Sequence, residues 1–199
     1  MKLVLASQSP RRQALLERLE IEFTVHAANV PETIIAGESP AAACQRLARE
    51  KALAVAHEYP NDLVIGADTM VILDGRILGK PVDDAAARQM LNDLSGNEHE
   101  VITGVALVRL SENHDSVLVE STAVRFHRLT QEVIDYYVDN HHPLDKAGAY
   151  GIQDWSGIFV AGITGCYHNV VGLPLARLYE QLIKYQFVPR LTSRKHLII

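Results

Sequence analysis

The 199-residue chain is 48% hydrophobic and 22% charged, and its formal net charge at pH 7 is -5. These totals are typical of a globular protein with one substantial core, and the acidic balance argues against a general nucleic-acid binder, which would present a basic face. No run of about 18 apolar residues is present, so no membrane span is expected, and the N-terminus lacks the pattern of a signal peptide. Cys44 and Cys166 have no metal or disulfide spacing and fit a reducing compartment. We therefore expect a soluble, cytoplasmic protein.

Strand-like and helical patterns alternate in the first half of the chain. Serine followed by proline, at Ser9-Pro10 and again at Ser39-Pro40, is a signal for a helix start. Asp74-Gly75 is a strong hairpin signal after a long apolar run. The expected strands are 2–6, 23–28 and 63–73, and the expected helices are 10–19 and 39–59.

The second half continues the mixture. A helix capped by Asp83 or Asp84 is expected to end at Leu94, before Gly96. The other expected elements are β-rich segments at 98–110, 116–129 and 158–163 and helices at 131–140 and 174–185. The alternation predicts an α/β (mixed α+β) fold: one domain over residues 1–199 with a mixed, twisted sheet, flanking helices and two lobes. The tail from about residue 188 is basic and then apolar, and we expect it to be partly flexible.

The turn Ser7-Gln8-Ser9 is followed directly by Arg11 and Arg12 at a helix start. Cations are poorly placed there, because the positive end of the helix dipole lies at the N-terminus. Ser7, Ser9 and the free helix amides would form an anion cradle, and the two arginines would add charge-assisted contacts to phosphate oxygens. The alternative is that Ser9 only caps the helix and the arginines are solvated.

Two charged residues lie within apolar patterns. Asp68 is alone in the strand-like run LVIGADTMVIL, where a carboxylate is costly unless it binds a metal, pairs with a cation or faces a cleft. Lys51 falls between Leu47 and Val55 at helical spacing, on the stripe that should be buried. Either Lys51 snorkels outward or it reaches across the core edge toward a phosphate.

Two further segments are candidates for ligand contact. Lys80 follows the Asp74-Gly75 turn, and a hairpin tip that carries this lysine could close over an anionic ligand, although a solvated lysine is the simpler interpretation. The segment DKAGAYGIQ (145–153) combines Asp145, Lys146 and Gln153 with glycines that permit close backbone approach. A purely structural loop is the alternative there.

Seven segments carry a resemblance to a known family. They are LASQSPRR (5–12), LAREKA (47–52), IGADTMV (65–71), LGKP (78–81), LSG (94–96), PLDKAGAYGIQ (143–153) and VVGLP (170–174). In this order they resemble the Maf family of nucleoside triphosphate pyrophosphatases. The resemblance implies hydrolysis between the α and β phosphates, a divalent metal (Mg or Mn), a two-lobed cleft fold related to the inosine-triphosphatase-like enzymes, and a homodimer.

The resemblance also implies roles for individual residues. Asp68 matches the catalytic acid that activates water. Arg11, Thr69 and Gln153 match the positions of members that act on dTTP and UTP, whereas a sister group that acts on 7-methyl-GTP differs there. A Gln amide offers both a donor and an acceptor to a uracil or thymine edge. The phosphates would be held by Ser7, Ser9, Arg12, Lys51 and Lys80, and Asp145 and Lys146 would complete the pocket.

One position departs from the family pattern. In NVPETI, Pro31 stands where the family usually has the first of two acids, so only Glu32 remains. We expect Glu32 and Asp68 to hold the metal, and Asp68 could act as ligand, base or both. The alternatives for the whole protein are a nucleotide-binding regulator of cell division or septum formation with little turnover, and a phosphatase that releases inorganic phosphate.

Overall fold

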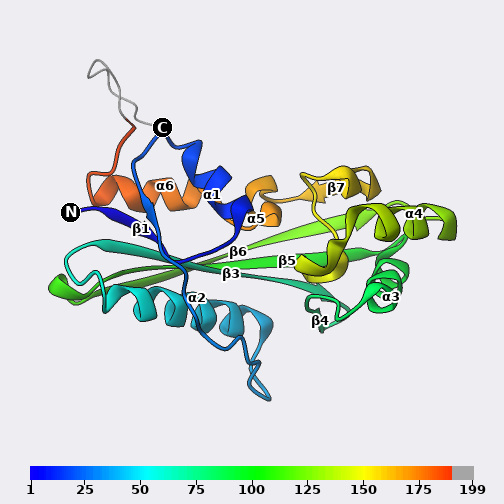
Figure 1. Cartoon of the computed structure of the whole chain (residues 1–199), viewed down its shortest axis with the longest axis horizontal. Helices are drawn as coiled ribbons and strands as arrows, with labels where there is room; N and C mark the ends of the chain where they lie inside the picture. Colours follow the sequence, from blue (N-terminus) through cyan, green and yellow to red (C-terminus); the bar gives the residue numbers. More distant parts are fainter. Residues whose placement is uncertain (190–199) are drawn as a thin grey trace.

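A computed structural model describes residues 1–189 of the protein. The fold is built on a seven-stranded mixed sheet (Figure 1). The strands are β1 (Leu3–Leu5), β2 (Thr24–Val25), β3 (Leu63–Leu73), β4 (Arg76–Leu78), β5 (Glu98–Arg109), β6 (His114–Phe126) and β7 (Val160–Thr164). Their order is β2-β1-β3-β5-β6-β7, and β4 pairs with β3 off this path. β1 is parallel to β2 and β3, and the other pairs are antiparallel.

Helices cover both faces of the sheet, as Figure 1 shows. They are α1 (Pro10–Glu17), α2 (Pro40–Ala56), α3 (Asp84–Leu94), α4 (Gln131–His141), α5 (Tyr167–Val171) and α6 (Leu175–Lys184). α2 lies along one face, α1 and α6 lie on the other, and α3 and α4 gather at the end near β7. None of the helices within residues 1–189 has the length and apolar character needed to cross a membrane.

Strand alternation explains why the sheet has a core on each face. Leu3 and Leu5 of β1 pack toward α1 and α6, whereas Val4, between them, packs with Ala48 and Ala52 of α2. β3 is buried along almost its whole length because both of its faces are covered, which accounts for its continuous apolar run.

Most of the predicted elements are confirmed, with changes at their ends. The β3 bounds and the Asp83 cap of α3 are as predicted, and Asp74 and Gly75 both have the positive φ of a tight hairpin turn. The predicted 10–19 and 39–59 helices end earlier, at Glu17 and Ala56, because their last turns tighten into i→i+3 hydrogen bonds.

Other predictions were wrong in detail. The predicted 158–163 strand starts at Val160, because Trp155–Phe159 forms a 3₁₀ helix. The short helix α5 was missed altogether. Residues 190–199 of the predicted flexible tail lie outside the described residues.

Two glycines let α2 lie directly against the sheet. A Cβ on Gly66 of β3 would lie 2.1 Å from the Ala48 carbonyl oxygen, and one on Gly104 of β5 would lie 2.5 Å from the Cys44 carbonyl oxygen. Gly104 is the register partner of Asp68, so this close approach brings α2 against the acid.

We expect Gly104→Ala to lower the free energy of unfolding by about 2–3 kcal/mol, since the new methyl group meets helix backbone that cannot rotate away. Urea denaturation monitored by circular dichroism measures the change. Gly79→Ala is the matched control: a Cβ there meets no atom within 4 Å, and we expect a change below about 0.5 kcal/mol. Equal stability of the two variants would contradict the proposed packing.

Candidate active site

The site lies at a gap in one edge of β3. β1 pairs with Leu63–Ile65 and β4 pairs with Val71–Leu73, while β5 occupies the opposite edge along nearly the whole strand. Among the described residues no strand pairs with residues 66–70 at the first edge. Asp68 and Thr69 therefore stand where the sheet opens, and a cleft of about 450 Å³ lies against them.

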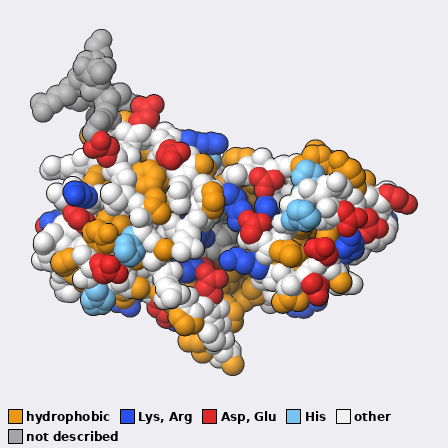
Figure 2. Space-filling view, viewed as in Figure 1, with side chains coloured by type: hydrophobic (Ala, Val, Ile, Leu, Met, Phe, Trp, Pro, Cys, Tyr) orange, Lys and Arg blue, Asp and Glu red, His pale blue; other side chains and the backbone are white. Residues whose placement is uncertain are grey.

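Every site residue singled out from the sequence lines this one cleft. They are Ser7, Ser9, Arg11, Arg12, Glu32, Lys51, Asp68, Thr69, Lys80, Asp145, Lys146 and Gln153. Figure 2 shows lysine and arginine side chains around the hollow in the middle of the displayed face. The cleft is thus a largely cationic site, suited to an anionic ligand.

The turn between β1 and α1 is held by its own hydrogen bonds, and its role as an anion cradle stays a prediction. Ser9 caps α1 by accepting a hydrogen bond from the Arg12 backbone N–H at 3.4 Å, and its own N–H donates to the Ser7 hydroxyl at 3.2 Å. Pro10 occupies the first helical position, where its missing N–H costs nothing. The N-terminal end of α1 therefore opens toward the cleft with its positive dipole end.

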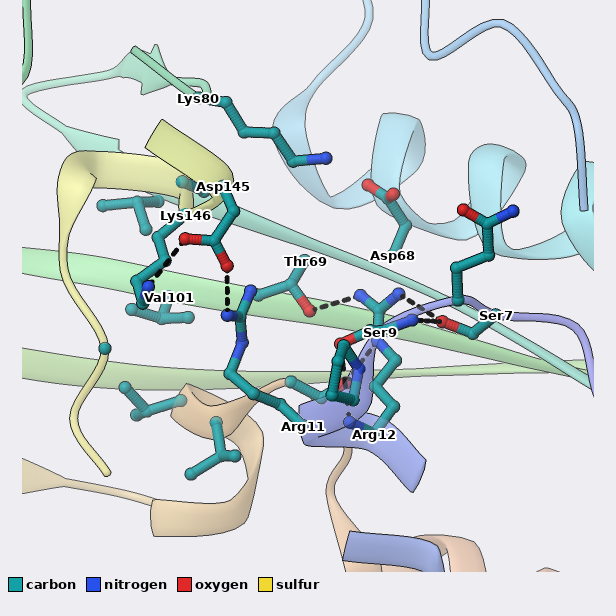
Figure 3. Close-up of a pocket in the computed structure, with 18 of the residues that line it drawn as sticks. Ser7, Ser9, Arg11, Arg12, Asp68, Thr69, Lys80, Val101, Asp145 and Lys146 are labelled. Carbon is teal, nitrogen blue, oxygen red and sulfur yellow. Dashed lines mark hydrogen bonds and ion pairs between the residues drawn. The ribbon is translucent and has the colours of Figure 1, made fainter. Parts of the chain in front are cut away.

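Arg12 is not a solvated surface residue. Its Nε donates to the Gly172 carbonyl at 2.9 Å and one terminal nitrogen donates to Thr69 Oγ1 at 3.0 Å (Figure 3). Burial lowers the pKa of Arg12, and the nearby charges of Asp68 and Glu32 oppose that shift. This arginine joins α1, β3 and the end of α5.

Arg11 turns the other way, toward the 143–154 segment. Its guanidinium pairs with Asp145 at 2.7 Å, and Lys146 contacts the other oxygen of Asp145 at 2.6 Å (Figure 3). Partial burial would raise the pKa of Asp145, but Lys146 and Arg11 outweigh it and the net shift is downward. A carboxylate of the protein itself thus compensates the charge of Arg11 at the helix start.

Lys51 lies between two carboxylates. Its ammonium is 2.6 Å from Asp68 Oδ1 and 2.5 Å from Glu32 Oε1, and the lysine is only 6% exposed. Desolvation opposes ionisation of Glu32, yet the hydrogen bond and charge of Lys51 hold its pKa below the usual range. The idea that Lys51 snorkels outward is wrong. Its phosphate-binding role stays a prediction, since an ammonium group has three donors and the carboxylates use two.

The second oxygen of Asp68 faces a thiol. Cys44 Sγ lies 3.9 Å from Asp68 Oδ2 and 3.6 Å from the Asp68 carbonyl oxygen, a weak contact at best. Burial and the charge of Asp68 raise the pKa of Cys44 to about 12, so the thiol is neutral at pH 7. Oδ2 therefore keeps most of its acceptor capacity.

Two acidic side chains of the cleft, Glu32 and Asp68, are suited to a metal ion that enters the cleft bound to the phosphates of a ligand. Within residues 1–189 no group of three or more Asp, Glu, His or Cys side chains could form a complete metal cage. Glu32 and Asp68 do converge on one point, the Lys51 ammonium. One or two carboxylates together with substrate phosphates are the usual protein environment of Mg²⁺, so this donor set suits such an ion.

The remaining predicted residues reach the cleft from its far side. Lys80 points into it from the segment after β4 (Figure 3), so the prediction that the hairpin tip carries this lysine was wrong: the tip is Asp74-Gly75. Gln153 and Tyr150 line the cleft from the glycine-rich segment, and the Tyr150 hydroxyl lies 2.8 Å from His99 Nε2.

Sequence reasoning missed three contributors. Thr103 contacts Thr69, and Cys44 contacts Asp68. Gly172 supplies the carbonyl that accepts a hydrogen bond from Arg12. The signal for Thr103 was available, since it is a lone threonine within the apolar run VITGVALV.

Comparison with known proteins identifies the family of the chain. The family profile described as Maf-like protein matches residues 2–185. The chain is 50% identical over 186 residues to the dTTP/UTP pyrophosphatase of Symbiobacterium thermophilum, covering 94% of this chain and 95% of the relative. It is 45% identical over 185 residues to the dTTP/UTP pyrophosphatase of Clostridioides difficile, covering 93% of this chain and 95% of the relative.

The fold has a more distant relative among solved structures. A HAM1 protein from Coxiella burnetii matches with a TM-score of 0.50 and 19% identity, over 92% of this chain and 99% of that chain. This likeness is one of fold alone. The chain belongs to the Maf family.

The two cysteines should differ in reactivity. Cys44 is fully buried with a raised pKa, whereas Cys166 is partly exposed. We expect iodoacetamide at pH 8 to label Cys166 alone in the native protein and both cysteines after denaturation, as read by peptide mass spectrometry. Cys44→Ser, which removes the buried thiol, should leave native labelling unchanged. Fast native labelling of Cys44 would contradict the described packing behind Asp68.

Proposed function

We propose that this protein hydrolyses dTTP and UTP to the nucleoside monophosphate and pyrophosphate. The observation that carries the proposal is the convergence of a buried carboxylate, Asp68, with Arg12, Lys51 and Lys80 in a single cleft at the end of α1. The activities named for the relatives at 45–50% identity support the same choice of substrate.

The cations would hold the triphosphate. Ser9 and the start of α1 line the cleft and would contribute the positive end of the helix dipole, Lys80 points into the cleft from the opposite side, and Lys51 keeps one donor free. Arg12 is held in place by Gly172 and Thr69, so it loses little side-chain entropy when it binds phosphate.

Glu32 and Asp68, together with the substrate phosphates, would hold a divalent metal, Mg²⁺ or Mn²⁺. When bound, it would supply neutralisation of the negative charge that develops on the phosphate oxygens.

Asp68 would orient a water molecule and accept its proton. Lys51 donates to Oδ1, while among the described residues a distant thiol is the sole partner of Oδ2, which would be the oxygen open to water. Asp68 and Thr69 are neighbours on β3, so the group that activates water lies beside one that would contact the base. The phosphate nearest the nucleoside is then the one attacked, and pyrophosphate is the leaving group.

Arg11, Thr69 and Gln153 would recognise the base. Asp145, which also pairs with Lys146, holds the Arg11 guanidinium on the far wall of the cleft, where its remaining N–H groups can donate to pyrimidine carbonyl oxygens. The ring of Tyr150 lines the same wall and offers an apolar surface to the base.

Replacement of the catalytic acid tests the reaction. We expect wild type to convert UTP and dTTP to monophosphate and pyrophosphate, and Asp68→Asn to lower kcat about 10³-fold, the scale of a lost general base. Chromatography of the nucleotides and a pyrophosphate assay give both products.

Asp115→Asn is the matched control, because that acid pairs with Arg49 outside the cleft, and it should keep full activity. Normal turnover in Asp68→Asn would refute its role. Release of inorganic phosphate would point to a phosphatase, and nucleotide binding without turnover would point to the regulator.

The metal proposal makes a separate prediction. Glu32→Gln keeps the shape but removes a negative charge, so we expect the Mg²⁺ concentration for half-maximal rate at saturating UTP to rise about 10-fold. Initial rates over a Mg²⁺ series measure it. Glu38→Gln, which changes an acid paired with Arg46 outside the cleft, is the control. An unchanged Mg²⁺ requirement in Glu32→Gln would exclude Glu32 as a ligand.

Three further expectations stay predictions: a homodimer, a cytoplasmic location, and a single domain over residues 1–199. Light scattering after size exclusion tests the first of them.

A further inference from the structure

Thr103 lies behind the cleft wall without reaching the cleft. It is fully buried in β5, directly opposite Thr69 in the antiparallel register. The two hydroxyl oxygens are 3.0 Å apart, and Thr103 Oγ1 also lies 3.0 Å from the backbone carbonyl oxygen of Asn169. No proposed contact with substrate or metal uses Thr103.

These contacts fix the direction of each hydrogen bond. A carbonyl can only accept, so Thr103 donates its single hydroxyl hydrogen to Asn169. Thr103 can then only accept from Thr69, which means that Thr69 donates its own hydrogen to Thr103. Arg12 has donors alone, so its N–H donates to Thr69 at 3.0 Å. The chain runs from Arg12 through Thr69 and Thr103 to the Asn169 carbonyl.

The consequence is that Thr69 has no hydrogen left for a ligand. A hydroxyl oxygen has one hydrogen and two lone pairs. The hydrogen goes to Thr103 and one lone pair goes to Arg12, so a single acceptor site remains. Toward the cleft, Thr69 can accept a hydrogen bond but cannot donate one.

Gln153 cannot make this distinction. Within residues 1–189 its exposed side chain makes no hydrogen bond, so the amide is free to turn over. A freely turning amide can match a uracil edge with one face and a cytosine edge with the other. Selection between these bases therefore needs a partner whose polarity is fixed.

We propose that Thr103 is a specificity-determining positioning residue: by holding Thr69 as an acceptor, it selects pyrimidine nucleotides whose N3 carries a hydrogen. Uracil and thymine have N3–H, which donates to Thr69, whereas cytosine has an N3 lone pair that would face the lone pair of Thr69. The proposal rests on the function proposed above and on a base bound next to Thr69.

The test is the ratio of kcat/KM for UTP to that for CTP. Thr103→Val removes the acceptor, so the Thr69 hydroxyl is released to donate to cytosine N3. We expect the ratio to fall at least about 10-fold, chiefly through a lower KM for CTP, and Thr103→Ser to restore the wild-type ratio. An unchanged ratio in folded Thr103→Val would overturn the proposal.

Thr122→Val is the matched control for loss of a buried hydroxyl. Thr122 is also buried, and its hydroxyl accepts from the Asn169 side chain at 2.9 Å, but within residues 1–189 it makes no hydrogen bond to Thr69 or Thr103. We expect this variant to lower Tm without changing the UTP to CTP ratio. A ratio that falls equally in Thr122→Val would assign the effect to general loosening and overturn the proposal.

A wild-type measurement keeps the test independent of how the variants fold. The triphosphate of the pyrimidin-2-one riboside lacks both the N3 hydrogen and the amino group of cytosine. We expect wild type to reject it about as strongly as CTP. Rapid hydrolysis of this analogue would overturn the role of Thr103 even while UTP hydrolysis upheld the proposed function. Failure to hydrolyse UTP at all would instead refute the proposed function, and this inference with it.

Discussion

The incomplete pairing of β3 is the constraint on which the site depends. β1 is only three residues long and β4 joins β3 only beyond Val71, so the strand is left without a neighbour along part of one edge. The opposite edge is paired with β5 from Val64 to Ile72, which holds this stretch in the sheet. Two consecutive side chains, Asp68 and Thr69, point to opposite faces of the sheet, yet both line the cleft because the sheet is interrupted there.

Because Asp68 and Thr69 lie on opposite faces of the sheet, their side chains have different surroundings. Asp68 faces α2, which the glycines of β3 and β5 allow to approach closely, and it meets the Lys51 ammonium and the Cys44 thiol. Thr69 faces α1 and α5, where its hydroxyl accepts a hydrogen bond from Arg12 and shares one with Thr103. One strand therefore places an acidic side chain and a hydrogen-bonded hydroxyl next to each other, and the close packing of α2 is what brings the buried Lys51 ammonium to the acid.

Local signals allowed much of this arrangement to be predicted. Ser9-Pro10 marked the start of α1, the acid inside an apolar strand marked Asp68, and helical spacing placed Lys51 on the buried face. What the sequence alone left undetermined depends on pairs far apart in the chain. Arg11 meets Asp145 across 134 positions, and Thr69 meets Thr103 only because β3 and β5 align in that register. Lys80 was assigned to the hairpin tip because the turn was recognised but the length of β4 was not.

The measurement that tests the central claim most directly is hydrolysis of UTP in water enriched with heavy oxygen, with the label located by mass spectrometry of the products. If Asp68 directs water to the phosphate beside the nucleoside, the label enters UMP and the pyrophosphate stays unlabelled. Label in the pyrophosphate would place the attack on the next phosphorus and contradict the proposed position of the triphosphate between Asp68 and the cationic residues of the cleft.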